Sequence, residues 1–344
     1  MRQLTVAYGG MSEDYLAPGD RRRFAGFASR SQMLMIPTSA EGAAAVVLTL
    51  GADISRWREY KKKHGVLILD IVDAYLDETA FSPKRIFRGV YKSLNGTFAK
   101  VNLDYQKLLR ELISHADLVI CASEEQRLTL LELNSNVHAI VDCFDELYNS
   151  VQRAPSVTMD SPILWEGYPE NLKHFKILRS SKSESLSIHK FSIVTLPTHR
   201  NSIGLGQSQT SSYFDRIGLR AKIIPWTLHN LQTTAGDCKF AIIPIDRRDP
   251  MAWKKSENKL LGFWAMGIPV LVSPTPSYTR AALSAGCESI LVEEGQWEST
   301  LEKLTSDDEF LRRSIMDGHK YALDNALSRA VDSRWMSALQ SVDL

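Results

Sequence analysis

The alternation of short apolar runs with longer helical patterns is the feature that most constrains the fold of this chain. Runs of four to six apolar residues, bounded by turn residues, are typical of strands buried on both faces of a parallel sheet. In the first half of the chain such runs occur at residues 4–8, 45–50, 66–71, 118–121 and 137–140. Helical patterns occupy residues 20–29, 105–114 and 124–133. This order predicts an α/β protein with a doubly wound sheet.

A second series of the same kind begins after a polar segment, residues 151–162, that carries two prolines. Its apolar runs lie at residues 163–165, 191–194, 221–224, 240–243, 270–273 and 289–292. We therefore predict a first domain of residues 1–150, a linker of residues 151–162 and a second domain of residues 163–320, with the two domains facing across a cleft. Residues 321–344 are predicted to be helical; where they pack is left open, and the first domain is one of the alternatives.

The composition excludes several classes of protein. The chain has 344 residues and a formal charge of +1, whereas a general nucleic-acid binder is usually basic. Its four cysteines lack metal-ligand spacing, which indicates buried free thiols. No apolar run approaches the roughly 20 residues of a membrane span, and the N-terminus has no signal-peptide pattern. We expect a cytoplasmic protein with no nucleic-acid partner and no tightly bound metal or other cofactor.

The sequence "KKSENKLLGFWAMGIPVLVS" (residues 254–273) carries the strongest functional signal. It predicts a buried helix with Ser256 as its N-cap, ended by Gly267 and followed by a strand. Lysines precede this helix, and Lys259 stands in its first turn, where a cation is disfavoured by the helix dipole. A bound anion accounts for this arrangement, because free N–H groups, the dipole and ammonium groups then share one phosphate. The alternative is that the lysines are solvated and pair with Glu257 or Asp249.

The residues of this region resemble those of a known family. The stretch "CKFAIIPID…WKKSENKLLGFWAMGIPVLVSPTPSY" is similar to the donor-binding half of GT-B glycosyltransferases, enzymes with two Rossmann-like domains. "ADLVICASEEQRLTLLELNSNVHAIVDCFDE" resembles the end of that family's first domain, and "ILWEGYPENL" the opening of its second. "APGDRRRFAGFA" is a shorter match to a first-domain loop and helix. The resemblance covers most of residues 116–320.

This resemblance implies a nucleotide-sugar donor and a glycan, lipid-linked or other acceptor, as in the synthesis of cell-surface polysaccharides or glycoconjugates. Contacts to the donor diphosphate are expected from Lys255, Ser256, Asn258, Lys259, Gly19 and Gly167. Contacts to the nucleoside or sugar are expected from Trp226, Asp246, Glu257 and Asn171. For Gly167 and Trp226 the alternatives are a turn glycine and a core indole, respectively.

One departure from the family pattern concerns two glutamates. Many retaining members carry them eight positions apart, and the corresponding residues here are Lys254 and Gly262. Glu257 or Asp246 are candidates to replace them. The retaining or inverting outcome therefore stays open.

The first domain offers candidates of its own. Asp70 and Asp73 follow a predicted strand, where a carboxylate can accept a proton from an acceptor hydroxyl, and Asp73 is the preferred catalytic base because it lies further out. The alternative is a helix cap or an ion pair. Asp20 is predicted to cap a helix. Arginines 21–23 and lysines 61–63 are either a solvated face or a weak contact to an anionic membrane surface or to the phosphates of a lipid diphosphate acceptor.

Two rival functions remain open on the sequence alone. A nucleotide-sugar epimerase would need placed acid and base carboxylates and would turn over without an acceptor. A non-catalytic relative that binds a glycan or a partner enzyme is favoured by the missing glutamate pair.

Overall fold

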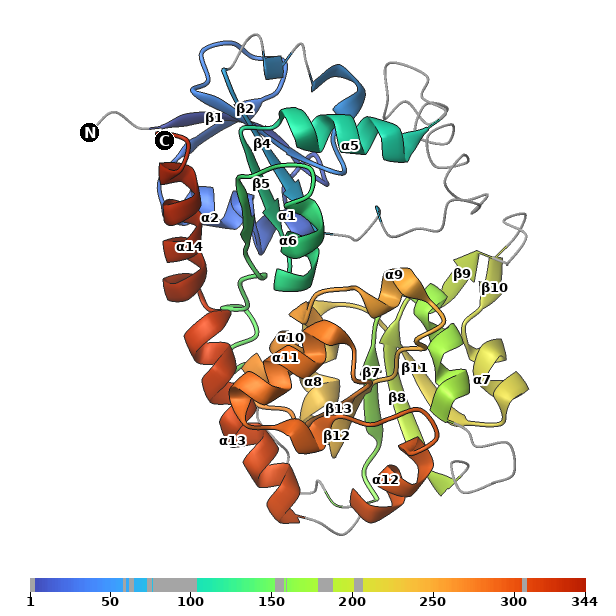
Figure 1. Ribbon diagram of the computed structural model, residues 1–344. Helices are drawn as coiled ribbons and strands as arrows, with labels where there is room; N and C mark the ends of the chain where they lie inside the picture. Colours follow the sequence, from blue (N-terminus) through green and yellow to red (C-terminus); the bar gives the residue numbers. More distant parts are fainter. Residues whose placement is uncertain are drawn as a thin grey trace. The chain divides into compact units, whose positions relative to one another are not determined.

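The computed structural model describes residues 4–57, 60–61, 65–72, 76, 104–151, 158, 160–178, 188–200, 207–304 and 308–344. These residues form two compact units (Figure 1). Unit 1 comprises residues 1–143, 254–258 and 325–344, and unit 2 comprises residues 144–253 and 259–324. Because the chain passes between the units more than once, each unit is assembled from segments that are distant in the sequence.

The described part of unit 1 contains a six-stranded sheet in the order β2-β1-β3-β4-β5-β6. Every pairing between neighbouring strands in it is parallel. Its strands are β1 (Thr5–Gly9), β2 (Leu34–Pro37), β3 (Ala45–Thr49), β4 (Val66–Ile71), β5 (Leu118–Cys121) and β6 (Val137–Ala139). Its helical segments are α1 (Pro18–Arg21), α2 (Phe24–Arg30), η1 (Ile54–Arg56), α5 (Tyr105–His115), α6 (Glu124–Leu130) and α14 (Ser328–Gln340).

Helices cover both faces of the unit 1 sheet. On one face, α5 and α6 pack on alternate strand residues such as Val46, Leu69 and Val119. On the other face, α2 and α14 meet through aromatic rings, and the Phe27 and Trp335 rings stack with their centroids 5.7 Å apart. Alternate residues of each strand are thus buried against different helices, which is the doubly wound arrangement.

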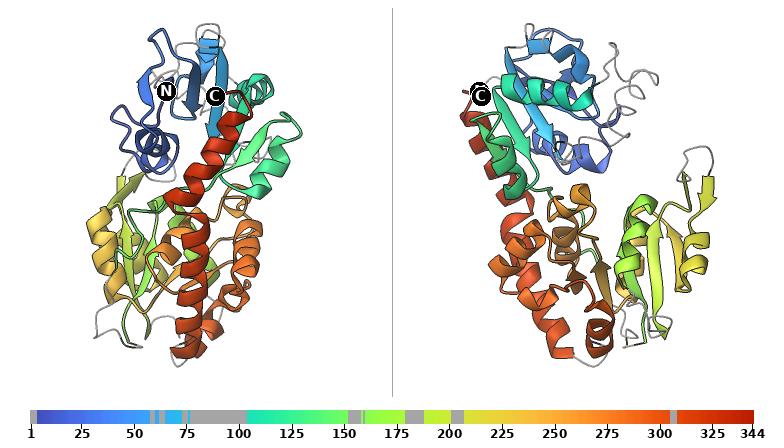
Figure 2. Two further views of the ribbon diagram at one scale, coloured as in Figure 1. Left: turned by 90° about the vertical axis from the view of Figure 1, so that its left-hand side faces the viewer. Right: turned by 45° about the vertical axis from the view of Figure 1, so that its right-hand side comes forward.

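The described part of unit 2 contains a five-stranded parallel sheet in the order β11-β8-β7-β12-β13. Its strands are β7 (Ile163–Glu166), β8 (Lys190–Thr195), β11 (Arg220–Pro225), β12 (Phe240–Ile243) and β13 (Val270–Val272). A separate antiparallel hairpin, β9 (Thr198–Arg200) and β10 (Gln207–Gln209), projects from the sheet near α7 (Figure 2). The helical segments are η3 (Pro169–Leu178), α7 (Ser211–Ile217), α8 (Leu228–Asp237), α9 (Pro250–Trp253), α10 (Asn258–Ala265), α11 (Pro276–Ala285), η5 (Glu288–Ile290), α12 (Trp297–Leu304) and α13 (Asp308–Asn325).

One face of the unit 2 sheet carries an apolar cluster that includes Trp165, Phe191 and Ile242 together with residues of η3, α7 and α12. Helix α8 contacts β7 and β8, and the side chains of its Leu231 and Ala235 are buried. Unit 2 is therefore a second Rossmann-like layer structure, and the predicted doubly wound α/β class is confirmed.

Several sequence expectations require correction. The helix predicted at residues 20–29 is two helices, α1 and α2, interrupted at residues 22–23. Residues 289–292 were predicted as a strand; they instead contain part of a 3-10 turn and a single bridge from Leu291 to Val272. The strand β2 was not predicted, although its segment has a four-residue apolar run; none of its residues is fully buried. The β9–β10 hairpin was not predicted because its strands are short and polar.

The C-terminal prediction of helix is confirmed by α13 and α14. α13 packs on α10 through Gly318, since a Cβ at this glycine would lie 2.6 Å from Cε2 of the fully buried Trp264. His319 of α13 also contacts the Trp264 carbonyl at 2.9 Å. The missing side chain of Gly318 therefore allows the indole ring to fit against the helix.

We expect Gly318→Ala to lower the free energy of unfolding by about 1–2 kcal/mol. Alanine normally stabilises a helix relative to glycine by up to about 1 kcal/mol, but here its methyl group would overpack the Trp264 ring. Thermal and urea unfolding of the variant give the measurement. Met316→Ala, at an exposed position of the same helix, is the control and should change the free energy by no more than about 0.5 kcal/mol. A more stable Gly318→Ala protein would contradict the packing described.

Candidate functional site

In unit 2, polar side chains converge at the carboxyl ends of β7, β8 and β11. Parallel pairing places these strand ends at one edge of the sheet, where ligands bind in folds of this kind. Glu166 ends β7, Thr195 ends β8, and Trp226 follows β11 directly. Lys259, in the first turn of α10, completes the group. We refer to Glu166, Gly167, Trp226 and Lys259 as the β7 site.

The Lys259 ammonium group is held by the end of β7. Its Nζ donates to the Glu166 carbonyl oxygen at 2.6 Å and lies 3.5 Å from Oε2 of the Glu166 carboxylate. Nζ also lies 5.4 Å from the centre of the buried Trp165 ring. Both side chains of the ion pair are partly exposed, 28% for Lys259 and 22% for Glu166. The lysine is therefore positioned by protein contacts and still reaches solvent.

The same Glu166 carboxylate orients Trp226. The indole Nε1 of Trp226 donates to Glu166 Oε1 at 3.0 Å, and its backbone N–H donates to the Thr195 carbonyl at 3.0 Å. The Trp226 side chain is only partly buried. An indole fixed in this way offers a flat face beside a cation, an arrangement that suits a base or sugar ring.

Gly167 leaves room for Lys259. A Cβ at this position would lie 2.7 Å from Lys259 Nζ and 3.1 Å from carbons of the Trp165 ring. Its own N–H donates to the Val194 carbonyl at 3.2 Å, and its carbonyl accepts from Thr195 Oγ1 at 2.6 Å. The backbone of residue 167 is thus fixed by β8, and its lack of a side chain keeps the lysine close to the strand end.

The structure brings together Gly167, Trp226 and Lys259 of the predicted residues, and it adds Glu166, which the sequence analysis passed over. The available signal for Glu166 was its place at the end of a strand next to Gly167. Asn171 lies in the first turn of η3, with its N–H bonded to the Tyr168 carbonyl. Lys255, Ser256, Glu257 and Asn258 belong to unit 1, and Asp73 lies outside the described residues.

Two expectations about the helix start need correction. α10 begins at Asn258, so Ser256 stands two residues before the helix and not at its N-cap. The alternative pairing of Lys259 with Asp249 is wrong, because the Asp249 carboxylate is bound by Lys173 and Lys259 by Glu166. The predicted burial of the helix itself is confirmed, since Leu260 to Ala265 are all buried.

The position of the second family glutamate is closed by apolar side chains. A Cβ on Gly262 would lie 3.3 Å from Phe144 Cε1 and 3.5 Å from Leu147 Cδ1. A longer carboxylate side chain there would have to displace these groups. The absence of a glutamate at position 262 therefore agrees with the close packing around α10.

Asp246 is bound within the loop that follows β12. Its carboxylate accepts from Arg248 Nε at 2.8 Å and from Lys176 Nζ at 2.7 Å. Burial opposes its ionisation, but these cationic donors outweigh burial and keep the pKa of Asp246 below its ordinary value. Asp246 remains a predicted contact to the donor, although its oxygens already have partners in this structure.

His174 supports the same loop from η3. Its Nδ1 accepts a hydrogen bond from the Asp246 N–H at 3.2 Å, so the neutral ring carries its proton on Nε2, which lies 3.7 Å from Asp249 Oδ2. The His174 ring is 3% exposed, and burial lowers the pKa of His174 to about 4. A proton on Nδ1 would face the Asp246 N–H, so this hydrogen bond would be lost and the two N–H groups would repel each other.

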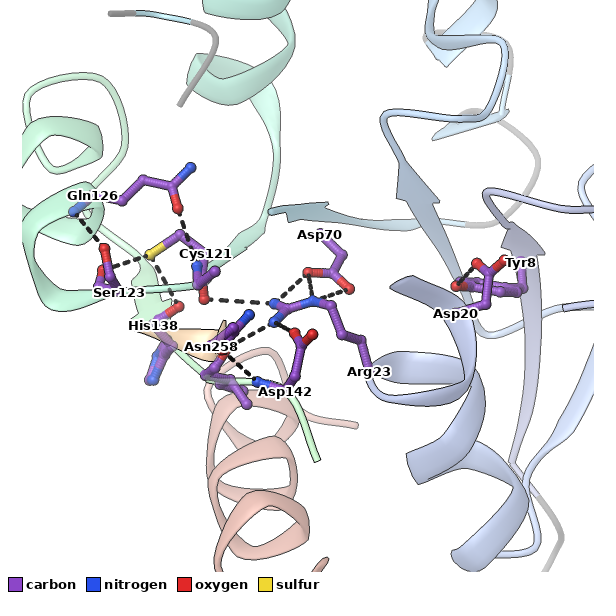
Figure 3. A network of polar contacts seen from close by, with 12 residues as sticks. Tyr8, Asp20, Arg23, Asp70, Cys121, Ser123, Gln126, His138, Asp142 and Asn258 are labelled. Atoms are coloured by element: carbon purple, nitrogen blue, oxygen red, sulfur yellow. Dashed lines mark hydrogen bonds and ion pairs between the residues drawn. The ribbon is translucent and has the colours of Figure 1, made fainter. Parts of the chain in front are cut away.

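In unit 1, the carboxyl edge of the sheet is occupied by a buried ionic network (Figure 3). Arg23, fully buried, donates to Asp70 at 2.6 Å, to Asp142 at 3.1 Å and to the Ile140 carbonyl at 2.7 Å. Asp142 in turn donates its N–H to the Asn258 side chain at 3.1 Å. Burial alone would lower the pKa of Arg23, but the two carboxylates outweigh it, and the guanidinium stays charged. The cation at this edge therefore has its partners within unit 1.

The structure of unit 1 corrects two hypotheses about the first domain. Arg23 is wrongly counted among cations available to a membrane or phosphate, because it is enclosed by Asp70 and Asp142. Asp20 does not cap a helix. It lies inside α1 and accepts from Tyr8 Oη at 2.6 Å and from the N–H groups of Met11 and Ser12 at 2.8 and 2.9 Å.

Gly19 is packed closely against the loop that follows β1. A Cβ on Gly19 would collide with the Met11 side chain, so this glycine admits the loop that follows β1. All four cysteines are free and buried, as predicted, and burial raises the pKa of Cys121 to about 12.

No group of His, Cys, Asp and Glu side chains within the described ranges is arranged to hold a metal ion. Among the described helices, none has the length and apolar character needed to cross a bilayer.

Comparisons with known proteins place this geometry in a known fold. No protein-family model matches the sequence, and no curated protein matches it significantly. Among solved structures, HepE from Anabaena in complex with UDP and glucose aligns with a TM-score of 0.62 at 12% identity, over 98% of this chain and 100% of that chain. WaaG, a glycosyltransferase involved in lipopolysaccharide biosynthesis, gives 0.56 at 10%, over 99% and 100%.

TarM aligns with a TM-score of 0.57 at 10% identity over 86% of this chain, which spans 54% of the length of TarM. Identities this low show the fold alone. The chain has the GT-B fold, with two Rossmann-like domains, as the resemblance in the sequence implied.

Arg23→Ala should lower the free energy of unfolding by about 3–5 kcal/mol, because it leaves Asp70 and Asp142 as uncompensated buried charges. Arg30→Ala is the matched control. It breaks the partly exposed pair with Asp332 and should cost no more than about 1 kcal/mol. Equal losses for the two variants in chemical unfolding would contradict the buried network.

His174 should make the protein sensitive to acid between pH 6.5 and 4. Its folded pKa lies below the unfolded value of about 6.5, so the unfolded state binds the proton first and stability falls as the pH is lowered through this window. His174→Asn keeps an acceptor for the Asp246 N–H. It should remove up to about 1.4 kcal/mol per pH unit from the slope of unfolding free energy.

Urea unfolding at closely spaced pH values measures this slope. The control is His229→Asn, at an exposed position of α8, which should leave the slope unchanged. An unchanged slope in His174→Asn would show that other groups cause the acid sensitivity.

Proposed function

We propose that the protein is a glycosyltransferase that binds a nucleotide-sugar donor at the β7 site. The observation that carries the proposal is the meeting of Gly167, Trp226 and Lys259 at the carboxyl edge of the unit 2 sheet. A cation held close to the strand end by a glycine and an oriented indole match two parts of a nucleoside diphosphate, its phosphate oxygens and its ring. The fold shared with HepE, whose structure holds UDP and glucose, supports this assignment.

In the proposed reaction, the bond between the sugar and the terminal phosphate oxygen breaks, and the sugar carbon bonds to a hydroxyl oxygen of the acceptor. Negative charge builds on the departing diphosphate. Lys259 and the N–H groups at the start of α10 stabilise this charge, which lowers the barrier. Asn171, Asp246 and Glu257 are proposed further contacts to the donor, and Lys255, Ser256 and Asn258 further contacts to its phosphates.

The acceptor is proposed to be a glycan or a lipid-linked saccharide that binds through unit 1, where Gly19 lies. The proposed base is Asp73. Asp70, three positions earlier, cannot serve as the base because its carboxylate is fully buried against Arg23.

Lys259→Met tests the donor site. Methionine keeps an apolar stem over Trp165 and removes the charge, so binding of UDP or GDP and of their sugars should weaken by about 1.5–3 kcal/mol, or roughly 10- to 150-fold. Titration calorimetry gives the affinities, and melting curves of the ligand-free variant report its folding. Lys190→Met, an exposed lysine at the amino end of β8, is the matched control and should bind as the wild type does.

A structural lysine would give a different pattern: lower stability of Lys259→Met with unchanged nucleotide affinity. That result would remove the donor site from this edge. Binding of nucleotide sugar with neither transfer nor hydrolysis in the presence of candidate acceptors would contradict the transferase and favour a non-catalytic binder.

A further inference from the structure

The β7 site holds a fixed negative charge beside its cation. Glu166 Oε2 lies 3.5 Å from Lys259 Nζ, and Oε1 accepts the Trp226 indole N–H at 3.0 Å. The carboxylate cannot rotate away from the lysine without giving up the indole. A phosphate that binds Lys259 therefore enters the field of the Glu166 carboxylate, and each added negative charge on that phosphate is penalised.

The donor and the product of glycosyl transfer differ in this charge. In a nucleotide sugar both phosphates are diesters, and each carries one negative charge. In the free nucleoside diphosphate the terminal phosphate has a second ionisation with a pKa near 6, so above about pH 7 it carries one more negative charge than the donor. A lysine alone would favour the more highly charged product.

We propose that Glu166 is a specificity-determining residue that lowers the affinity of the β7 site for the free nucleoside diphosphate relative to the nucleotide sugar. This inference rests on the proposed function. Its chemical basis is the repulsion between two anions, one fixed by Trp226 and one brought by the ligand. The result is faster release of the product and weaker inhibition by it.

The magnitude follows from the position of the pair. Repulsion between a carboxylate and a phosphate charge is strong in a buried site and is reduced by water. Glu166 is 22% exposed and therefore partly solvated, so the repulsion is moderate. One extra charge on the ligand should then change the relative affinity about tenfold.

Glu166→Gln isolates the charge. The amide oxygen of glutamine can still accept the Trp226 N–H, so the indole keeps its partner while the negative charge is removed. At pH 8 we expect the variant to bind both ligands more tightly than the wild type does, with a gain about tenfold larger for UDP than for UDP-glucose. At pH 5.5, where the terminal phosphate of UDP has taken up its proton, the gain for UDP should fall to that for UDP-glucose.

The control is Glu288→Gln, at an exposed position of η5, which should change neither affinity. Melting curves report folding of both variants. Should Glu166→Gln fold poorly, the wild type alone still provides a test, because its affinity for UDP relative to UDP-glucose should not rise as the pH rises from 5.5 to 8, whereas a lysine alone would make it rise.

The outcomes separate the two proposals. If the wild type binds neither UDP nor GDP nor their sugars, the proposed donor site fails. If it binds them but Glu166→Gln raises the affinity for UDP and UDP-glucose equally, or lowers both, Glu166 is only a structural partner of Lys259 and the inference fails. A wild-type ratio that rises with pH, as expected for a lysine alone, has the same meaning.

Discussion

Parallel strand pairing is the constraint on which the rest of this structure depends. It brings the carboxyl ends of neighbouring strands to one edge, so residues far apart in the sequence become neighbours. In unit 1 the edge gathers Asp70 of β4, the carbonyl of Ile140 and Asp142 after β6 around Arg23. In unit 2 it gathers Glu166, Thr195 and Trp226. Both sets of contacts follow from strand order, because no local segment contains them.

The charged groups at the two sheet edges differ in how deeply they are buried. In unit 1 a fully buried arginine satisfies two carboxylates, and desolvation makes each member depend on the others. In unit 2 the pair of Lys259 and Glu166 is partly exposed and therefore less costly to separate. A buried network fixes the geometry of its unit, whereas a partly solvated pair can exchange one partner for a ligand. This difference is why we assign binding to the β7 site and a structural role to the Arg23 network.

The surroundings of Lys259 also explain why a cation is tolerated at the start of a buried helix. The opposing helix dipole is offset by the Glu166 carbonyl and carboxylate, with the Trp165 ring below the ammonium group. These contacts satisfy the lysine in the absence of a ligand. If the proposed donor binds at the β7 site, its diphosphate has to replace these contacts, so they link the local stability of the site to its selectivity.

The sequence by itself determined the class of fold and most of the strands, because buried parallel strands are continuous apolar runs that can be recognised without a partner. It also singled out Gly167, Trp226 and Lys259, each through a local signal: a glycine or an aromatic residue at a strand end, and a cation at a helix start. Only the tertiary structure decided what these residues contact. The choice of Glu166 over Asp249 for Lys259 and the enclosure of Arg23 depend on contacts between residues 47 to 119 positions apart. The loop contacts of Asp20 join residues 8 to 12 positions apart that no helix or strand period relates. Charge pairing is decided by distance and burial, and a linear sequence carries neither until the sheet is formed.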